Sequence, residues 1–225
     1  MNADTDFSAG LSYALAYAAM GIPVLPLMPG KKTPHGNLAP RGFKDATTSV
    51  ATLRHWWGAC PGAGIGIYPG PAGLLVIDVD VKGAAVGLAT LERLQSTYGP
   101  LPSTLTQRTP SGGWHYVFQA PFQAGNGHKL GPGIDVRGGS GYIVVEPTII
   151  DGNAYRWIDW EVTSGRAPAV ALLPSWMEPL LLLKDAKPVL GNLETVVAKS
   201  DTYVSPETLS DLRLALMAAD NYLER

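Results

Sequence analysis

The chain has 225 residues, of which 46% are hydrophobic and 16% charged, with a net charge of −2. It is large enough for a substantial hydrophobic core, and no apolar run approaches the roughly 20 residues that a membrane-spanning helix needs. The single cysteine, Cys60, excludes an internal disulfide and argues against a zinc site, and a near-neutral chain does not favour nucleic-acid binding. We expect a cytoplasmic protein that does not associate with a membrane and does not bind zinc.

The N-terminal part is predicted to alternate between helices and extended chain. The spacing of apolar residues predicts, in chain order, a helix over residues 8–20, a strand over 23–27, a long surface loop over 29–45 and a helix over 49–57. The loop contains the basic pair Lys31 and Lys32. Long loops in compact domains are usually functional or mobile.

Strand signals dominate the middle of the chain. Short apolar runs bounded by turn residues predict strands over residues 64–68, 74–80, 103–108, 114–118, 133–137 and 142–146, with one helix over 84–98. The expected fold class is α+β, with an N-terminal helix-and-strand unit that packs on a mostly antiparallel sheet. We expect the active-site cleft to lie between the two parts.

The pattern weakens after Trp160. A short helix is predicted over residues 175–183, and Ser205 and Pro206 are typical of the first residues of another helix. We therefore expect a catalytic domain over residues 1–190, a linker over 191–204, and the start of a truncated C-terminal helical domain over 205–225.

Two aspartates end the strand predicted over residues 74–80. Asp78 and Asp80 are two residues apart, so their carboxylates should leave the same face of the strand about 7 Å apart. Such a pair repels unless a cation lies between, and Mg²⁺ or Mn²⁺ prefers oxygen ligands of this kind. A strand that simply runs out into solvent explains the pair equally well.

A glycine-rich turn follows, in the segment Thr109-Pro-Ser-Gly-Gly-Trp-His115. Gly112 and Gly113 allow backbone to approach a ligand closely, and Ser111 offers a hydroxyl, so the turn could hold a phosphate. An ordinary hairpin corner with a surface histidine at position 115 is the plainer interpretation of the turn taken alone.

A third aspartate stands in another glycine-bounded strand, Gly133-Ile-Asp-Val-Arg-Gly-Gly. Asp135 points away from the face of its apolar neighbours, and Arg137 shares its face. If that face also carries Asp78 and Asp80, three acidic ligands converge. Arg137 is equally well explained as a nucleotide contact or as an ion-pair partner.

Taken together, these motifs resemble the bifunctional DNA primase-polymerase (prim-pol) family of the archaeo-eukaryotic primase superfamily. That family has an acidic pair on a strand, a Ser-Gly-Gly-x-His turn and a later Asp before Arg-Gly-Gly, in this order. The basic loop and the Trp56-Trp57 pair also look like the N-terminal half of the family. The resemblance covers roughly residues 8–160.

The resemblance implies a role for each quoted residue. It makes Asp78, Asp80 and Asp135 ligands of Mg²⁺ or Mn²⁺, with two ions expected, and adds His115 to the catalytic residues. The residues that it implies for nucleotide binding are Ser111, Gly112, Gly113 and His115, and Arg137, Lys31 and Lys32 are weaker candidates for the same role.

The resemblance also implies an activity and its partners. The activity is template-dependent nucleotidyl transfer by a DNA primase/polymerase, on a single-stranded DNA template and a primer strand, with dNTPs or NTPs. Phage or plasmid replication is the expected setting, and a helicase domain often follows in the same chain. One alternative is a replication-initiator module that binds DNA without catalysis, and another is a metal-dependent phosphoesterase.

Overall fold

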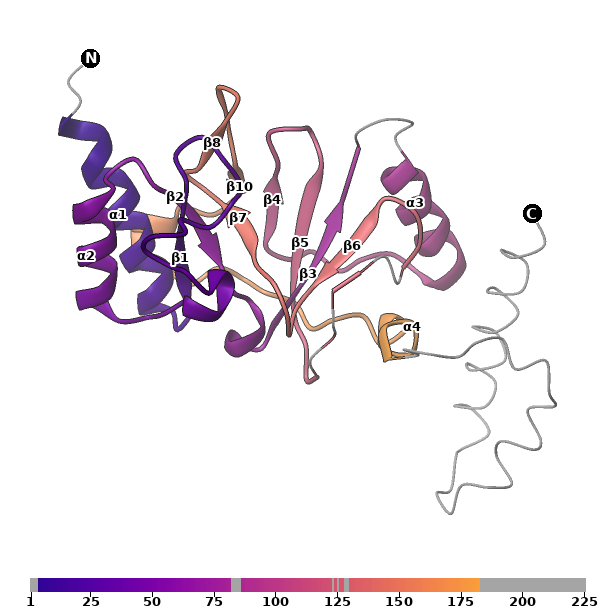
Figure 1. Ribbon diagram of the computed structural model, residues 1–225. Helices are drawn as coiled ribbons and strands as arrows, with labels where there is room; N and C mark the ends of the chain where they lie inside the picture. The colour runs from indigo at the N-terminus through magenta and orange to yellow at the C-terminus, as the bar shows by residue number, and fades with distance from the viewer. Residues whose placement is uncertain (1–3, 82–85, 123, 125, 128–129, 183–225) are drawn as a thin grey trace. The chain divides into compact units, whose positions relative to one another are not determined.

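The computed structural model describes residues 4–81, 86–122, 124, 126–127 and 130–182 (Figure 1). The chain divides into two compact units, Met1–Pro174 and Ser175–Arg225. In the second unit the described residues include helix α4, Met177–Leu182, close to the predicted helix. The predicted linker over 191–204 and the helix from Ser205 lie outside the described residues.

A small antiparallel sheet and two helices form the N-terminal part of the first unit (Figure 1). The elements are α1 Asp4–Ala19, β1 Val24–Leu27, α2 Val50–Ala59, β2 Gly64–Ile67 and β7 Ile143–Val145. The strand order is β1-β2-β7, and every residue of these three strands is buried. Ser49 caps α2, because its side chain accepts a hydrogen bond from the Thr52 backbone N–H.

A larger sheet of five antiparallel strands makes up the middle of the unit. Its strands are β3 Leu74–Val79, β4 Thr106–Arg108, β5 Trp114–Gln119, β6 Ile134–Arg137 and β10 Arg156–Ile158. They lie in the order β10-β4-β5-β3-β6, and helix α3, Val86–Tyr98, contacts β3 and β6 (Figure 1). The remaining elements are a ribbon of β8 Ile149–Ile150 and β9 Asn153–Ala154, and 3-10 turns over Gly42–Asp45, Gly70–Ala72 and Val162–Ser164.

A core of aromatic and branched side chains joins the helices to the two sheets. Its fully or almost fully buried members include Tyr17, Val24, Leu53, Trp57, Ile65, Val76, Val117 and Val145. Tyr17 crosses between the two parts of the unit, because its hydroxyl donates to the Glu146 carbonyl and accepts from Trp157 Nε1 at 2.7 Å. These hydrogen bonds satisfy polar atoms that would otherwise be costly to bury.

The predicted α+β class and the mostly antiparallel sheet are confirmed. The predicted helices and strands occur with shifts of a few residues, and Asp80 lies one residue beyond the end of β3. Strands β8, β9 and β10 were not predicted. No helix in the described part of the chain is both long enough and apolar enough to cross a membrane.

Candidate active site

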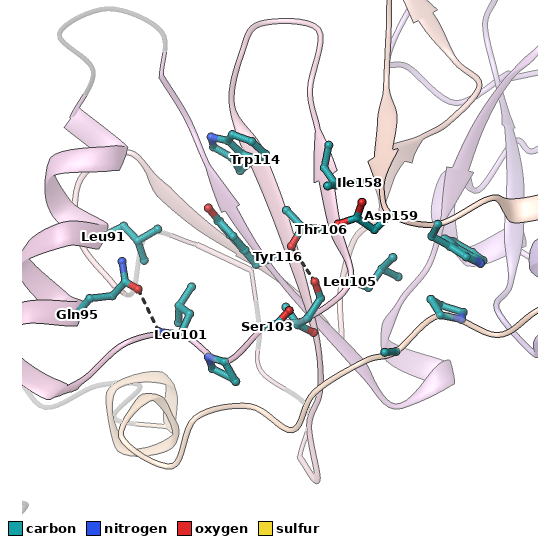
Figure 2. Close-up of a pocket in the computed structure, with 15 residues that line it drawn as sticks. Leu91, Gln95, Leu101, Ser103, Leu105, Thr106, Trp114, Tyr116, Ile158 and Asp159 are labelled. Carbon is teal, nitrogen blue, oxygen red and sulfur yellow. Dashed lines mark hydrogen bonds between the residues drawn. The ribbon is translucent and has the colours of Figure 1, made fainter.

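The two faces of the five-stranded sheet carry two cavities of similar size. His115 lines one of them, and its neighbours on β5, Trp114 and Tyr116, line the other, because side chains alternate along a strand. The cavity of Trp114 and Tyr116 has about 480 Å³, and Asp159 is the only charged side chain among its described lining residues (Figure 2). The cavity of His115 has about 460 Å³ and contains all three predicted aspartates. The second cavity is therefore the candidate active site.

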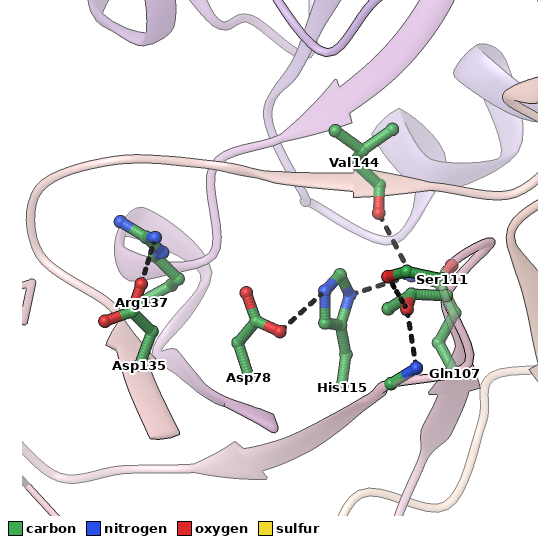
Figure 3. Close-up of polar contacts among 9 residues, drawn as sticks. Asp78, Gln107, Ser111, His115, Asp135, Arg137 and Val144 are labelled. Atoms are coloured by element: carbon green, nitrogen blue, oxygen red, sulfur yellow. Dashed lines mark hydrogen bonds and ion pairs between the residues drawn. The ribbon is translucent and has the colours of Figure 1, made fainter. Parts of the chain in front are cut away.

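One cross-strand row of polar side chains runs beneath this cavity, and three of its four members line it. In the strand register Gln107 on β4 is paired with His115 on β5, His115 with Asp78 on β3, and Asp78 with Asp135 on β6. Paired residues on neighbouring antiparallel strands point to the same face of a sheet. Residues from four segments of the chain thus lie side by side, and His115 Nε2 is 3.4 Å from Asp78 Oδ1 (Figure 3).

Asp80 is held at the edge of the same cavity by its backbone. Its N–H donates to the Gly133 carbonyl at 2.8 Å, just beyond the end of β3. Gly87, near the start of α3, packs directly against the backbone of Asp80 and Gly133. A Cβ atom on Gly87 would lie 2.3 Å from the Asp80 carbonyl oxygen and 2.5 Å from that of Gly133. The contact requires a glycine, and it fixes α3 against the segment that presents Asp80.

The glycine-rich turn brings Ser111 to the cavity wall. Gly112 has φ +88°, which favours glycine, and a Cβ on Gly113 would lie 2.5 Å from the Val79 carbonyl oxygen. Thr109 closes the turn, because its hydroxyl accepts from the Gly113 N–H at 3.0 Å and lies 3.2 Å from Ser111 Oγ. The two glycines therefore shape the turn and hold it against β3; they are described residues but do not line the cavity.

Basic and aromatic side chains complete the wall. Arg137 forms an ion pair with Asp135, so the ion-pair interpretation of Arg137 describes this structure (Figure 3). Lys32 also lines the cavity, and its Nζ lies 5.9 Å from the centroid of the Tyr155 ring. Lys31, which the structure also describes, is exposed and is not a lining residue. The loop thus contributes one of its two lysines.

Several lining residues were not singled out from the sequence. They are Phe43, Thr109, Asn126, Gly141, Tyr142, Ile143, Val144 and Tyr155. Tyr155 packs beside His115, with ring centroids 5.9 Å apart. Tyr142 holds the basic loop in place, since its hydroxyl donates to the Lys32 carbonyl at 2.7 Å. Thr109 and Tyr142 stand next to the quoted motifs, whereas Tyr155 has no local signal.

The charges around Asp78 keep its carboxyl ionised. Burial by itself would raise the pKa of Asp78, but the hydrogen bond from His115, followed by the positive charges of Arg137 and Lys32, lowers the pKa below its ordinary value. Asp78 therefore presents a charged carboxylate to the cavity at neutral pH.

Asp80 shows the opposite shift. Burial and then the negative charge of Asp78 raise the pKa of Asp80, Asp135 adds to this effect, and Lys32 opposes it. The charges of Asp78 and Asp80, after burial, also raise the pKa of the Tyr155 hydroxyl, which keeps it protonated. The negative potential of the carboxylates thus extends through the cavity.

The carboxylates have the oxygen chemistry that a hard divalent cation takes, although they do not form a ready-made cluster. No group of three or more His, Cys, Asp or Glu side chains within the described residues is arranged to hold a metal ion. One oxygen of Asp78 faces His115 and one of Asp135 faces Arg137. Mg²⁺ takes carboxylate oxygens and keeps waters, so it needs few protein ligands. A cation near Asp80 would also relieve the repulsion that raises its pKa.

The Asp80→Asn variant should melt at a higher temperature than the wild type when divalent ions are absent. A raised pKa means that the folded state binds protons more tightly, so the charge on Asp80 lowers stability once the pH exceeds that pKa. Asp80 is largely exposed, so we expect a gain of at most about 1 kcal/mol, or about 2–4 °C. The difference should shrink as the pH falls through the pKa of Asp80.

Thermal melting with and without Mg²⁺ or Mn²⁺ checks this prediction. The ions should raise the melting temperature of the wild type more than that of Asp80→Asn, because only a ligand of the folded state stabilises it. Asp151→Asn makes the same chemical change in an exposed turn and should match the wild type throughout. An equal response of all three proteins to the ions would contradict a metal site at Asp80.

Comparison with protein families finds a match over most of the chain. The family model described as "Bifunctional DNA primase/polymerase, N-terminal" matches residues 14–176. This range is well over half of the chain and includes every lining residue of the cavity. A search among curated proteins finds no match.

Proposed function

The chain belongs to the bifunctional DNA primase/polymerase family, and we propose that it catalyses template-dependent nucleotidyl transfer in the cavity of His115. The observation that carries the proposal is the convergence of Asp78, Asp80 and Asp135 with His115 and Ser111 on one cavity of about 460 Å³. Its volume is within the range of small-molecule sites and suits a nucleotide.

In the proposed reaction the 3′-oxygen of the primer bonds to the α-phosphorus of a nucleoside triphosphate. The 3′-hydroxyl gives up its proton to solvent water, the bond between the α-phosphorus and the oxygen that bridges to the β-phosphate breaks, and pyrophosphate leaves. Asp78, Asp80 and Asp135 would hold Mg²⁺ or Mn²⁺, and such ions lower the pKa of the attacking hydroxyl and neutralise charge on the leaving group. Without intervening cations, three carboxylates would repel the triphosphate.

The remaining lining residues bind and orient the substrate. Lys32 brings a positive charge from the basic loop, and Ser111 offers a hydroxyl at the glycine turn. Arg137 neutralises part of the charge of Asp135 and presents further N–H groups to the cavity. Because the protein itself takes little part in the covalent chemistry, catalysis consists mainly of positioning the substrate and stabilising charge.

The wider setting follows from the family alone. Membership of the DNA primase/polymerase family implies that the substrates are DNA and nucleotides. We place the reaction on single-stranded template in the cytoplasm, in replication of a phage or plasmid, with a helicase domain in the same polypeptide.

Extension of a labelled primer on a single-stranded template tests the activity. We expect the primer to lengthen when dNTPs or NTPs are supplied with Mg²⁺ or Mn²⁺, and to stay unchanged with EDTA. A non-catalytic initiator module would instead bind duplex DNA in EDTA and never lengthen the primer. A phosphoesterase would shorten the primer without nucleoside triphosphates.

A further inference from the structure

Gln107 is fully buried where the two sheets of the first unit meet. It stands on β4, and its amide makes three contacts with groups of β5, β7 and the residue after β7. Nε2 donates to the Val144 carbonyl at 3.0 Å, Oε1 accepts from the Glu146 backbone N–H at 3.0 Å, and Nε2 is 2.9 Å from His115 Nδ1 (Figure 3). Gln107 is the only one of the four cross-strand row residues that does not line the cavity.

The orientation of this amide is fixed by backbone chemistry. A carbonyl oxygen only accepts and a backbone N–H only donates, so Nε2 must face Val144 and Oε1 must face Glu146. One N–H of Nε2 is used by Val144, and the other points to His115 Nδ1. Turning the amide round would leave two buried backbone groups facing groups of the same polarity.

The fixed amide determines which nitrogen of His115 carries the proton. Since Nδ1 receives an N–H from Gln107, it must act as an acceptor and carry no hydrogen of its own. The proton of the neutral ring is then on Nε2, which faces the cavity and lies 3.4 Å from Asp78 Oδ1. His115 thus carries its N–H group on the cavity side, where Asp78 accepts it in this structure.

We infer that Gln107 is a positioning residue that fixes His115 as an Nε2–H donor toward the anionic oxygens of the bound nucleotide. The inference rests on the proposed function for the identity of the ligand. It also separates two roles of His115, since a ring locked in this form donates a hydrogen bond and does not accept the proton of the attacking hydroxyl.

Gln107 also has a structural role, because its contacts with Val144 and Glu146 tie the large sheet to the small one. Neither of these two bonds requires His115. Loss of the structural role alone should reduce the folded fraction, whereas loss of the positioning role should change the ring of His115 and the binding of nucleotide in protein that is folded.

Nitrogen-15 NMR of the histidine rings in wild-type protein is the first test, and its result does not depend on activity. The signals of His115 are identified by their loss in His115→Asn. We expect an unprotonated Nδ1 and a protonated Nε2 in mildly alkaline buffer. A hydrogen on Nδ1 of His115 would overturn the inference, and this outcome needs no Gln107 variant to fold.

Nucleotide kinetics of Gln107→Met provide the second test, since methionine has a similar length and offers no amide. In the folded fraction we expect both ring tautomers of His115 and about a tenfold rise in the KM for nucleotide, with a smaller change in kcat. Gln119→Met is the matched control, because Gln119 is an exposed residue at the end of β5 in the same sheet. It should leave both constants unchanged.

The outcomes separate the inference from the proposed function. An unchanged KM, together with a loss of activity no larger than the loss of folded protein, would show that Gln107 acts only through folding, and would overturn the positioning role. If the wild type adds no nucleotide at all, the proposed function fails, and the NMR result still decides whether Gln107 fixes the ring.

Discussion

Replacement of both Asp78 and Asp80 by alanine is expected to reduce primer extension by roughly 1,000-fold or more in kcat/KM. Both carboxylates face the cavity, and their loss removes the charge that would hold the catalytic ions. Loss of several kcal/mol of transition-state stabilisation, about 4 kcal/mol, corresponds to this factor. Steady-state incorporation of labelled nucleotide measures the effect.

The control for this variant is an aspartate that has a basic partner but lies outside the cavity. Asp45 pairs with Arg41 at 2.6 Å in the loop between β1 and α2. Arg41 is exposed, and a surface ion pair of this kind contributes little to stability, so Asp45→Ala should keep near-wild-type extension. Extension by the Asp78→Ala/Asp80→Ala protein at the rate of Asp45→Ala would remove the aspartates from the mechanism.

Gly87→Ala should have the second-largest effect, although the residue does not line the cavity. The added methyl group would meet the Asp80 and Gly133 carbonyl oxygens at 2.3 and 2.5 Å, and backbone atoms cannot turn away as a flexible side chain can. Helix α3 must therefore move from the end of β3. We expect a loss of about 1–3 kcal/mol in the free energy of unfolding and, because Asp80 shifts, a fall of about 100-fold in kcat/KM.

Gly58→Ala separates this packing effect from the ordinary effect of adding a methyl group to a helix. Gly58 is exposed in α2, and a Cβ there has open space around it. Alanine at this position should stabilise the protein by about 1 kcal/mol and leave extension unchanged. Denaturant unfolding and primer extension of both variants make the comparison. Wild-type stability and activity in Gly87→Ala would show that α3 does not hold Asp80 in place.

The sequence predicts the secondary structure of the site well. It predicts less well which residues of the site lie next to one another in space. Asp78, His115 and Asp135 each stand in a strand with a strong apolar or glycine-bounded pattern, so each strand was predicted. Whether the three side chains share a face depends on strand order and register. That information comes from pairing between distant segments, which no local pattern contains.

Gln107 and Tyr155 show why part of the site could not be predicted. Gln107 lies in a predicted strand, but its role depends on Val144 and Glu146, which are almost forty residues further along the chain. Tyr155 precedes β10, which was not predicted, and its ring lies beside that of His115 only because of the fold. Polar or aromatic residues of this kind become informative only when the fold brings their partners beside them.

The glycines illustrate a similar limit. The sequence indicates that Gly112 and Gly113 form a turn, and the structure adds that Gly113 is needed for its contact with the Val79 carbonyl. In the sequence, Gly87 is only a residue of low helix propensity near the start of a predicted helix. Its importance comes from close approach to Asp80 and Gly133, so it depends on packing and not on helix propensity.

Single-nucleotide incorporation on four templates tests the central claim most directly. The templates differ only in the first unpaired base, and each is annealed to the same labelled primer with all four nucleotides and Mg²⁺ or Mn²⁺. The wild-type chain should add the complementary nucleotide on each template, and the Asp78→Ala chain should add none. Addition that ignores the template base, or that continues undiminished without Asp78, would contradict template-directed transfer at this cavity.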